Sequence, residues 1–289
     1  MRRVVQGGGF SGSEFRTMMI VKKYIGIIPY LLIILIIIVL SIFPEGLSGF
    51  SPFEINMSGA TSPGSDHLCG TDFLGRDILS RSLIAARVSV LIGVVARCGS
   101  ILLGTLIGLF IGLSRSGRFI FNGVVEIFLS IPALLLAMGL AVVLGEGYRT
   151  IVIAIVIGTW SPVARFISAR VVEIRDRDYV LAARAIGAGY SRIALLYIIP
   201  ALIPSLLPLF TTGIATSIMM ESTLTFLGLG GSASVESVPS WGMMIQEGAK
   251  FIFDAPWIII PPSLLLMALI LSFNQLGDRM FRMRDAVDI

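Results

Sequence analysis

Residues 88–113 read VSVLIGVVARCGSILLGTLIGLFIGL, a stretch in which Arg97 is the only charged side chain. A helix needs about 20 mainly apolar residues to cross the roughly 30 Å hydrocarbon core of a bilayer, so this stretch predicts a transmembrane helix. Comparable stretches lie at 24–43, 119–144, 150–166, 203–227 and 257–276. The sequence therefore predicts an all-α membrane protein with six transmembrane helices.

The composition of the chain supports this class. Of the 289 residues, 55% are hydrophobic, only 14% are charged, and the mean hydropathy is +0.92. Soluble domains contain about 25% charged residues. A water-soluble fold has no means of burying so much apolar surface, so we expect a lipid bilayer around the chain.

The basic residues predict the orientation, because Lys and Arg accumulate in short cytoplasmic loops. With the N-terminus inside, five basic residues fall outside and sixteen inside. The outer ones are Arg76, Arg81, Arg87, Arg149 and Lys250, and the inner ones are Arg2, Arg3, Arg16, Lys22, Lys23, Arg115, Arg118, Arg165, Arg170, Arg175, Arg177, Arg184, Arg192, Arg279, Arg282 and Arg284. Both termini are therefore predicted to be cytoplasmic. The net charge of +4 follows from this topology, so no nucleic acid is expected as a partner.

The predicted spans divide the chain. The divisions are a cytoplasmic N-terminal segment (1–23), a first transmembrane helix (24–43), an outer loop (44–87), a core with five transmembrane helices (88–276) that includes an inner loop (167–202) and a second outer loop (228–256), and a cytoplasmic tail (277–289). The first apolar stretch is longer than the 7–15 residues of a signal-peptide core, and no small-residue cleavage site follows it. We expect it to be a retained anchor.

The inner loop contains the segment DYVLAARAIG at 178–187, which predicts a short helix. Asp176 or Asp178 is expected to cap its start, and Gly187 is placed to end it in the left-handed conformation. An apolar face with helical spacing is formed by Tyr179, Ala182, Ala183 and Ile186, and it is flanked by Arg177, Asp178 and Arg184. This face could receive another protein, pack on the chain's own helix ends, or lie in the lipid interface.

This loop resembles the EAA signature of importer permeases in the ATP-binding-cassette superfamily. The matching residues are Ala182, Ala183, Gly187 and Pro200, whereas Leu181 replaces the usual glutamate. The resemblance implies the MetI-like fold of type I importer permeases, in which this helix docks on a cytoplasmic ATPase. The residues it assigns to this coupling are Asp178, Tyr179, Ala182, Ala183, Arg184, Ile186 and Gly187.

More narrowly, the chain resembles the second permease of dipeptide, oligopeptide and nickel importers. The motifs that carry this likeness are His67, Gly70-Thr71-Asp72, Gly75-Arg76-Asp77, Ala86-Arg87-Val88-Ser89, Glu221, Phe226-Leu227-Gly228-Leu229-Gly230, Pro239-Ser240-Trp241-Gly242, Glu247-Gly248, Pro256-Trp257, Asn274 and Leu276-Gly277-Asp278. Glu221, Trp241, Arg76 and Asp77 are the residues expected to contact the pathway or a partner. The departures are Phe281-Arg282, Ala286 and the glycine- and serine-rich stretch at 230–234.

The resemblance also implies the partners and the location. These are a second, homologous permease subunit, two ATPase subunits, an extracytoplasmic binding protein, and the cytoplasmic membrane of a bacterium or archaeon. None of the three lysines follows a glycine, so the chain lacks the Gly-Lys pair of a phosphate-binding loop. We expect a transport subunit that is not an enzyme and holds no cofactor, with ATP and Mg²⁺ bound by partner subunits. The cargo stays open among peptides, nickel and metal chelates.

The alternative is a stand-alone secondary transporter or channel driven by an ion gradient. Its candidate groups are Arg97, Glu126 and Glu221, because charges inside a membrane are costly and often functional. For Arg97 we expect an ion pair with one of the two glutamates. The single histidine, His67, cannot form a multi-histidine metal site and is expected to be a hydrogen-bonded loop residue.

Overall fold

The computed structural model describes residues 26–56, 59–114, 117–230 and 238–285. The predicted segment 1–23, the stretch at 231–237 and the tail end at 286–289 lie outside the described residues. The helices run in chain order as α2 (Ile28–Ile42), α3 (Pro44–Ser48), α4 (Ile78–Leu113), α5 (Gly117–Ser130), α6 (Ala133–Leu144), α7 (Tyr148–Arg175), α8 (Asp178–Ala185), α9 (Tyr190–Ile193), the π-helix η1 (Ala194–Ile198), α10 (Ile199–Phe226), α11 (Trp241–Ala249), the 3₁₀-helix η2 (Pro256–Ile258) and α12 (Ile260–Asp285).

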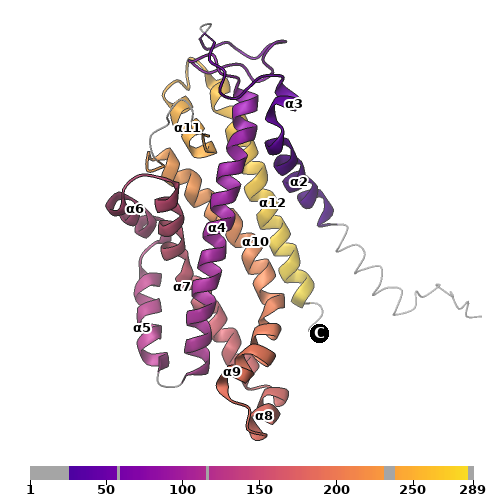
Figure 1. Ribbon diagram of the computed structural model, residues 1–289, viewed down its shortest axis with the longest axis vertical. Helices are drawn as coiled ribbons and strands as arrows, with labels where there is room; N and C mark the ends of the chain where they lie inside the picture. The colour runs from indigo at the N-terminus through magenta and orange to yellow at the C-terminus, as the bar shows by residue number, and fades with distance from the viewer. Residues whose placement is uncertain (1–25, 57–58, 115–116, 231–237, 286–289) are drawn as a thin grey trace, which may run out of the picture.

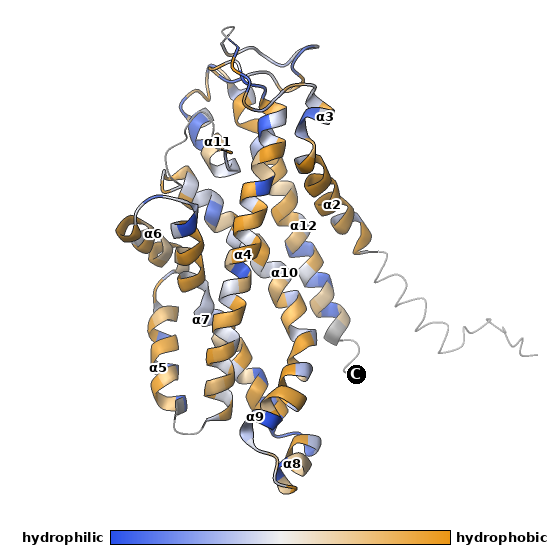
Figure 2. Ribbon diagram, viewed as in Figure 1, coloured by the Kyte–Doolittle hydropathy of each residue, from blue (hydrophilic) through white to orange (hydrophobic). Residues whose placement is uncertain are grey.

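The described residues form an elongated helical bundle (Figure 1). The loops after α3, together with α11, lie at its upper end, and α8 and α9 lie at its lower end. Apolar residues dominate the middle of the bundle (Figure 2). Within the described part of the chain, four helices are long and apolar enough to cross a membrane, at Ile78–Leu113, Tyr148–Arg175, Tyr190–Phe226 and Pro256–Met283.

The stretch at 119–144, predicted as one span, is two helices. Arg118–Ser130 and Ala133–Leu144 are bent by 88° across a short break. Pro132 explains the break, because proline lacks a backbone N–H and disfavours helical geometry in the residue before it. The pair adds a fifth candidate span if it is counted as one. The apolar helix α2 has 15 residues, fewer than predicted for 24–43.

Helices α4 and α7 pack closely because glycines remove side chains at their contact. A Cβ at Gly104 would meet the carbonyl oxygen of Trp160 at 2.8 Å, and one at Gly108 would meet the carbonyl oxygen of Ala164 at 2.8 Å. Below them, Arg175 on α7 donates a 2.8 Å hydrogen bond to the carbonyl oxygen of Gly112. Small residues of this kind let membrane helices approach closely.

Candidate functional site

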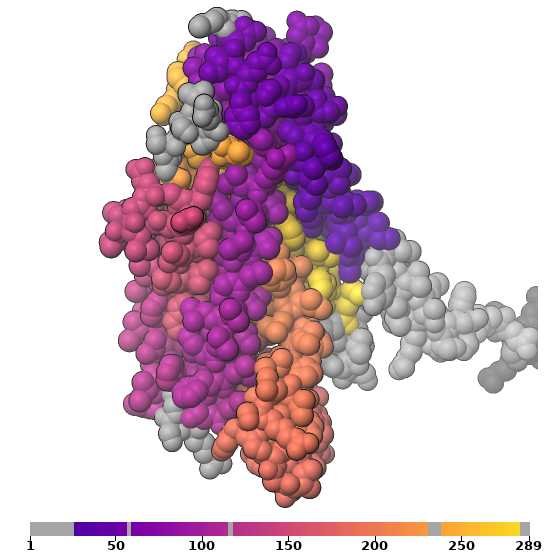
Figure 3. Space-filling model, viewed as in Figure 1, coloured from indigo at the N-terminus to yellow at the C-terminus, as the bar shows by residue number. Residues whose placement is uncertain are grey.

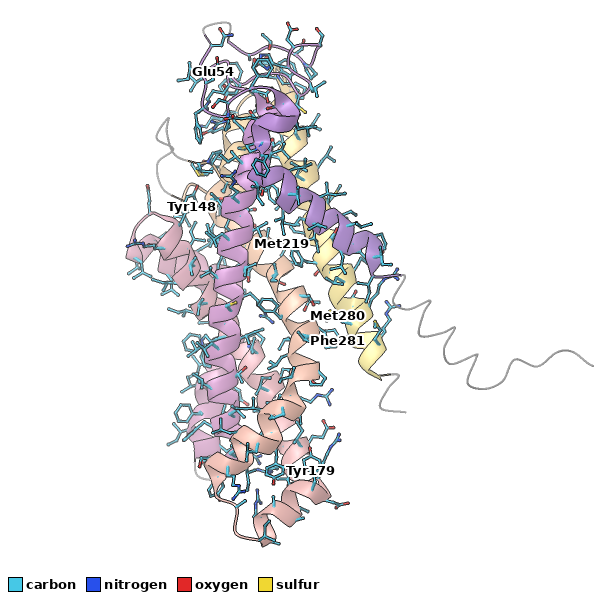
Figure 4. The ribbon with its side chains drawn as sticks, turned by 45° about the vertical axis from the view of Figure 1, so that its right-hand side comes forward. Glu54, Tyr148, Tyr179, Met219, Met280 and Phe281 are labelled. Carbon is cyan, nitrogen blue, oxygen red and sulfur yellow. The ribbon has the colours of Figure 1, made fainter. Side chains whose placement is uncertain are left out.

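The segment expected to contact another protein lies at the lower end of the bundle. The chain around α8 and α9 projects below the ends of α4 and α5 (Figure 3), and Tyr179 lies at this tip (Figure 4). Gly187 has a φ of +90°, and the Ala188 N–H donates to the Ala183 carbonyl at 3.0 Å. The predicted left-handed end of the helix at Gly187 is therefore confirmed.

The start of α8 differs from the prediction. Its N-cap is Arg177, and no side chain caps the helix there. Asp178 is the first helical residue, where the positive end of the helix dipole stabilises its negative charge. Asp176 instead lies 3.3 Å from Arg175 in an ion pair. The aspartates therefore act through charge at this turn and not through side-chain capping.

The four residues of the predicted apolar face do not share one environment. Ile186 is 86% exposed, Tyr179 and Ala182 are also exposed, but Ala183 is only 4% exposed. Ala183 and Val180 form the buried side of α8, and Val180 belongs to a core cluster with Ile193. Ala183 therefore packs inside the chain and offers no surface to a partner, which corrects its predicted place on the outer face.

At the upper end, Arg76 belongs to a network of charges, and Asp77 follows it as the N-cap of α4. Arg76 Nε lies 2.6 Å from Asp72 Oδ2, and Arg81 Nε lies 3.6 Å from the same oxygen. Glu247 lies 3.8 Å from Arg76 and 3.9 Å from Arg81. This network joins the loop before α4, and the first turn of α4, to α11. The roles of Asp72, Arg81 and Glu247 were missed, although the spacing of Asp72 and Arg76 was a visible signal for an ion pair.

Asp77 has two contacts that fix the start of α4. Its Oδ2 accepts a 2.8 Å hydrogen bond from the Ser80 N–H, and its Oδ1 lies 2.9 Å from His67 Nδ1. The prediction that His67 is a hydrogen-bonded loop residue is confirmed. Because Arg76 and Asp77 are both buried, their side chains hold the loop in place and do not form an exposed contact surface.

Glu221 and Trp241 are also buried where α10, α11 and α4 meet. Glu221 is 0% exposed and accepts hydrogen bonds from Ser222 at 3.1 Å and Thr225 at 3.4 Å. Trp241 Nε1 donates to the Ser82 carbonyl at 2.8 Å. Trp241 therefore joins α11 to α4, and Glu221 is bound by hydroxyl groups of its own helix. Neither side chain is exposed on the surface of this chain.

The predicted ion pair between Arg97 and a glutamate is wrong. Glu126 lies 3.4 Å from Arg165, and both side chains are largely exposed. Glu221 is bound by hydroxyl groups, whereas Arg97 Nη2 donates to the Leu209 carbonyl. The helical pattern places each residue on a face but gives no distance between helices, so the pairing was not readable from the sequence.

Together, the apolar bundle and its long helices define a multi-pass α-helical membrane protein. The chain belongs to the family described as "Binding-protein-dependent transport system inner membrane component", which matches residues 100–284. It is therefore a permease of a binding-protein-dependent importer, a transport subunit of the inner membrane without a catalytic role.

Several relatives extend this match over most of the chain. The oligopeptide transport system permease protein OppC of Bacillus subtilis is 36% identical over 89% of this chain and 83% of its own length. The dipeptide permease DppC of Alkalihalophilus pseudofirmus is 34% identical, covering 89% and 84%. The nickel permease NikC of Escherichia coli K12 is 34% identical, covering 89% and 92%.

Solved structures confirm the type of fold. An inward-facing structure of the MetNI methionine ABC transporter matches with a TM-score of 0.56 and 19% identity, covering 69% of this chain and 94% of the matched chain. A structure of an amino acid ABC transporter with histidines matches with a TM-score of 0.53 and 17% identity, covering 71% and 94%. The fold is that of a MetI-type ABC importer permease.

Proposed function

We propose that this chain forms half of the translocation pathway of an ATP-driven importer for dipeptides, oligopeptides, nickel or a metal chelate. A second, homologous permease subunit completes the pathway. The cargo classes come from the relatives, which are named for oligopeptide, dipeptide and nickel transport. The absence of a Gly-Lys pair in the chain supports binding of ATP and Mg²⁺ by two separate ATPase subunits.

The exposed side of α8 is the observation that carries this function. Tyr179, Leu181 and Ile186 are large apolar side chains exposed at the tip of the bundle. An exposed apolar patch rimmed by charges, here Asp178 and Arg184, is typical of a protein contact. We assign this surface to the ATPase. It comprises Asp178, Tyr179, Ala182, Arg184, Ile186 and Gly187, and Leu181 adds an apolar group where the family usually has a glutamate.

The helices support six crossings with both termini in the cytoplasm. The pair α5–α6 counts as one bent crossing, and α2 with the residues before it makes the first. In this arrangement α8 is cytoplasmic, as the inner positions of Arg170, Arg177 and Arg192 favour. The loops at 44–87 and 228–256 then face outward, where a binding protein delivers the solute.

The mechanism that follows is alternating access. Closure of the ATPase dimer on ATP draws the two α8 helices together, and α8 transmits this movement through its buried residues Val180 and Ala183. Ala188 and Gly187 end α8 in a tight turn, and Tyr190 begins the helix that continues into α10. A movement of α8 therefore acts directly on two long helices, α7 before it and α10 after it.

The test is purification of this chain from its native membrane with an affinity tag. We expect a second permease and two ATPases to co-purify, and a solute-loaded binding protein to stimulate ATP hydrolysis by the complex. Uptake into liposomes should require all of these components. Uptake by this chain alone, driven by an ion gradient, would contradict the proposal and restore the secondary-transporter alternative.

A further inference from the structure

Arg97 is a buried cation in the middle of α4, and among the described residues it forms no ion pair. Its side chain is 6% exposed, and its Nη2 donates a 2.5 Å hydrogen bond to the Leu209 carbonyl on α10. Within the described part of the chain, Nε is buried without a hydrogen-bond partner. A charge at the centre of a bilayer costs roughly 3 kcal/mol or more. One carbonyl does not offset this cost, so the guanidinium still lacks an anion.

This guanidinium occupies space that a glycine leaves free. Gly213 lies opposite Arg97 on α10, and a Cβ at position 213 would collide with Nε and Cζ of Arg97. The two helices also approach closely at Gly93, where a Cβ would collide with Ile218. The arginine is therefore fitted between α4 and α10 and does not extend freely into lipid.

A row of hydroxyl groups on α10 runs beside this slot. Thr212, Thr216 and Thr223 share one face of α10 with Met219, and this face is partly or fully exposed; Met219 is labelled in Figure 4. Each threonine hydroxyl donates to a backbone carbonyl of α10. Thr216 lies about 60° around the helix from Gly213, since each residue turns the helix by about 100°. Hydroxyl residues are typical of helix surfaces that meet another helix or a polar path. This face of α10 therefore carries hydroxyl groups next to the side of the helix that Gly213 turns to Arg97.

We propose that Arg97 binds a carboxylate within the membrane, on the α4–α10 side of the translocation pathway. This inference rests on the proposed function. The carboxylate belongs either to the transported solute, such as the C-terminus of a peptide, or to an acidic side chain of the second permease subunit. Arginine suits this role because its planar fork of donors matches a carboxylate and stays charged at all relevant pH values.

The test uses Arg97→Gln, which removes the charge, and Arg97→Lys, which keeps it without the fork. Arg165→Gln is the matched control, because it removes an exposed arginine that lies 3.4 Å from Glu126. Each complex is purified through this chain, and three properties are measured. These are recovery of the second permease, thermal unfolding with N-acetyl-dialanine or its C-terminal amide, and ATP-driven uptake of trialanine or its amide.

The two carboxylate sources give different results. If the solute supplies the carboxylate, Arg97→Gln lowers trialanine uptake roughly 10- to 100-fold, the usual effect of one charge-assisted hydrogen bond, but leaves amide uptake and assembly unchanged. N-acetyl-dialanine then stabilises the wild-type complex and not the variant. If the second permease supplies the carboxylate, Arg97→Gln reduces recovery of that subunit, whichever peptide is present. In both cases Arg97→Lys retains part of the function, and Arg165→Gln resembles the wild type.

The proposal is overturned if the Arg97→Gln complex recovers the second permease normally and shows wild-type uptake and thermal stabilisation with both the peptide and its amide. Failure of the proposed function has a different signature, which is a wild-type complex without ATP-driven uptake of any solute. The recovery and thermal unfolding measurements do not depend on uptake. These two measurements therefore still test whether Arg97 binds a carboxylate when the wild-type complex takes up no solute.

Discussion

At the scale of single residues, glycines decide how closely α4 approaches its neighbours. Gly104, Gly108 and Gly112 follow a four-residue repeat on the side of α4 that faces α7. A glycine in a helix interior costs about 1 kcal/mol relative to alanine. This cost is offset here by close packing, because a side chain at these positions would push against the backbone or a branched side chain of α7.

Gly108→Ala should therefore destabilise the protein in spite of the higher helix propensity of alanine. We expect a loss of about 1–3 kcal/mol, the usual cost of overpacking, measured by thermal unfolding of the detergent-purified chain. Gly139→Ala is the matched control, because a Cβ there has nothing within 4 Å. It should be neutral or stabilising by up to about 1 kcal/mol. Equal unfolding temperatures for the two variants would show that Gly108 does not set the helix spacing.

Asp72 is the second residue whose environment gives a clear prediction. It is buried and faces both Arg76 and Arg81, whereas the side chain of Glu247 is 38% exposed and lies at least 3.8 Å from either arginine. Removing one partner of a buried ion pair leaves an uncompensated charge, which costs about 3–5 kcal/mol. Exposed pairs contribute only about 0–1 kcal/mol.

We expect Asp72→Asn to destabilise the fold by about 3 kcal/mol, within the range for a broken buried pair, and to release the loop before α4. Glu247→Gln, the control, should cost less than about 1 kcal/mol. Limited proteolysis of the loop, together with thermal unfolding, measures both effects. A larger effect for Glu247→Gln than for Asp72→Asn would mean that the exposed acid, and not the buried one, holds the two arginines.

At the scale of elements, α8 has one face in the core and one in solvent. Ala183 lies on the buried face and Ala182 on the exposed face. Ala182→Glu places a bulky acid on the exposed face. It should leave the fold and its unfolding temperature intact but abolish the stimulation of ATP hydrolysis by a loaded binding protein. Ala183→Glu buries an unpaired carboxylate next to Val180, so it should destabilise the chain by several kcal/mol.

The two variants are compared by yield of folded protein, recovery of the ATPases and stimulated ATP hydrolysis. Arg192→Gln is a suitable control, because it changes a charge nearby, outside α8, on an exposed side chain. If Ala182→Glu binds the ATPases and couples normally, the assignment of this face to the ATPase is wrong. If Ala183→Glu folds as well as the wild type, the packing of α8 on the core is wrong.

The elements themselves were largely predictable from apolar length, and their ends were not. Helix α4 begins at Ile78, ten residues before the predicted stretch at 88–113. The added turns contain Arg81 and Arg87, whose charges argue against a span. The fold accommodates them through Asp72 and through the carbonyls of Ser41 and Ile42, which accept hydrogen bonds from Arg87. These partners are distant in sequence, so apolar length alone does not reveal them.

The candidate site was predictable only in part for the same reason. The turn at Gly187 is a local feature, and the sequence predicted it correctly. Whether Ala183 faces outward depends on where α8 lies against α7 and α10, which is a property of the tertiary fold. Glu221 and Trp241 were recognised as motif residues, but their burial among hydroxyl groups and carbonyls depends on α11 returning to α4.

At the scale of the whole molecule, the bent pair α5–α6 decides the topology. Between the loop at 59–77 and α9, the chain passes through α4, the pair α5–α6, and α7. If the pair crosses the membrane, three crossings place that loop and α9 on opposite sides. If it is a re-entrant loop, two crossings place them on the same side. Figure 1 shows the loop and α9 at opposite ends of the bundle, which favours three crossings.

Two serines report on this difference. Ser65 lies in the upper loop and Ser191 lies in α9 at the lower end, and both are exposed. Each is replaced by cysteine in a chain that lacks Cys69 and Cys98, expressed without the ATPases so that α9 stays uncovered. We expect a membrane-impermeant maleimide to label the Ser65→Cys chain in intact cells, and the Ser191→Cys chain only after permeabilisation.

Cys69 of the native chain should contribute little background labelling. Burial raises the pKa of the Cys69 thiol, with a smaller contribution from the Asp77 carboxylate. Fewer Cys69 thiolates therefore exist at neutral pH, and labelling of Cys69 should be slow and should rise with pH. Labelling of both engineered cysteines in intact cells would make α5–α6 re-entrant, whereas labelling of Ser191→Cys alone would invert the orientation and place α8 out of reach of a cytoplasmic ATPase.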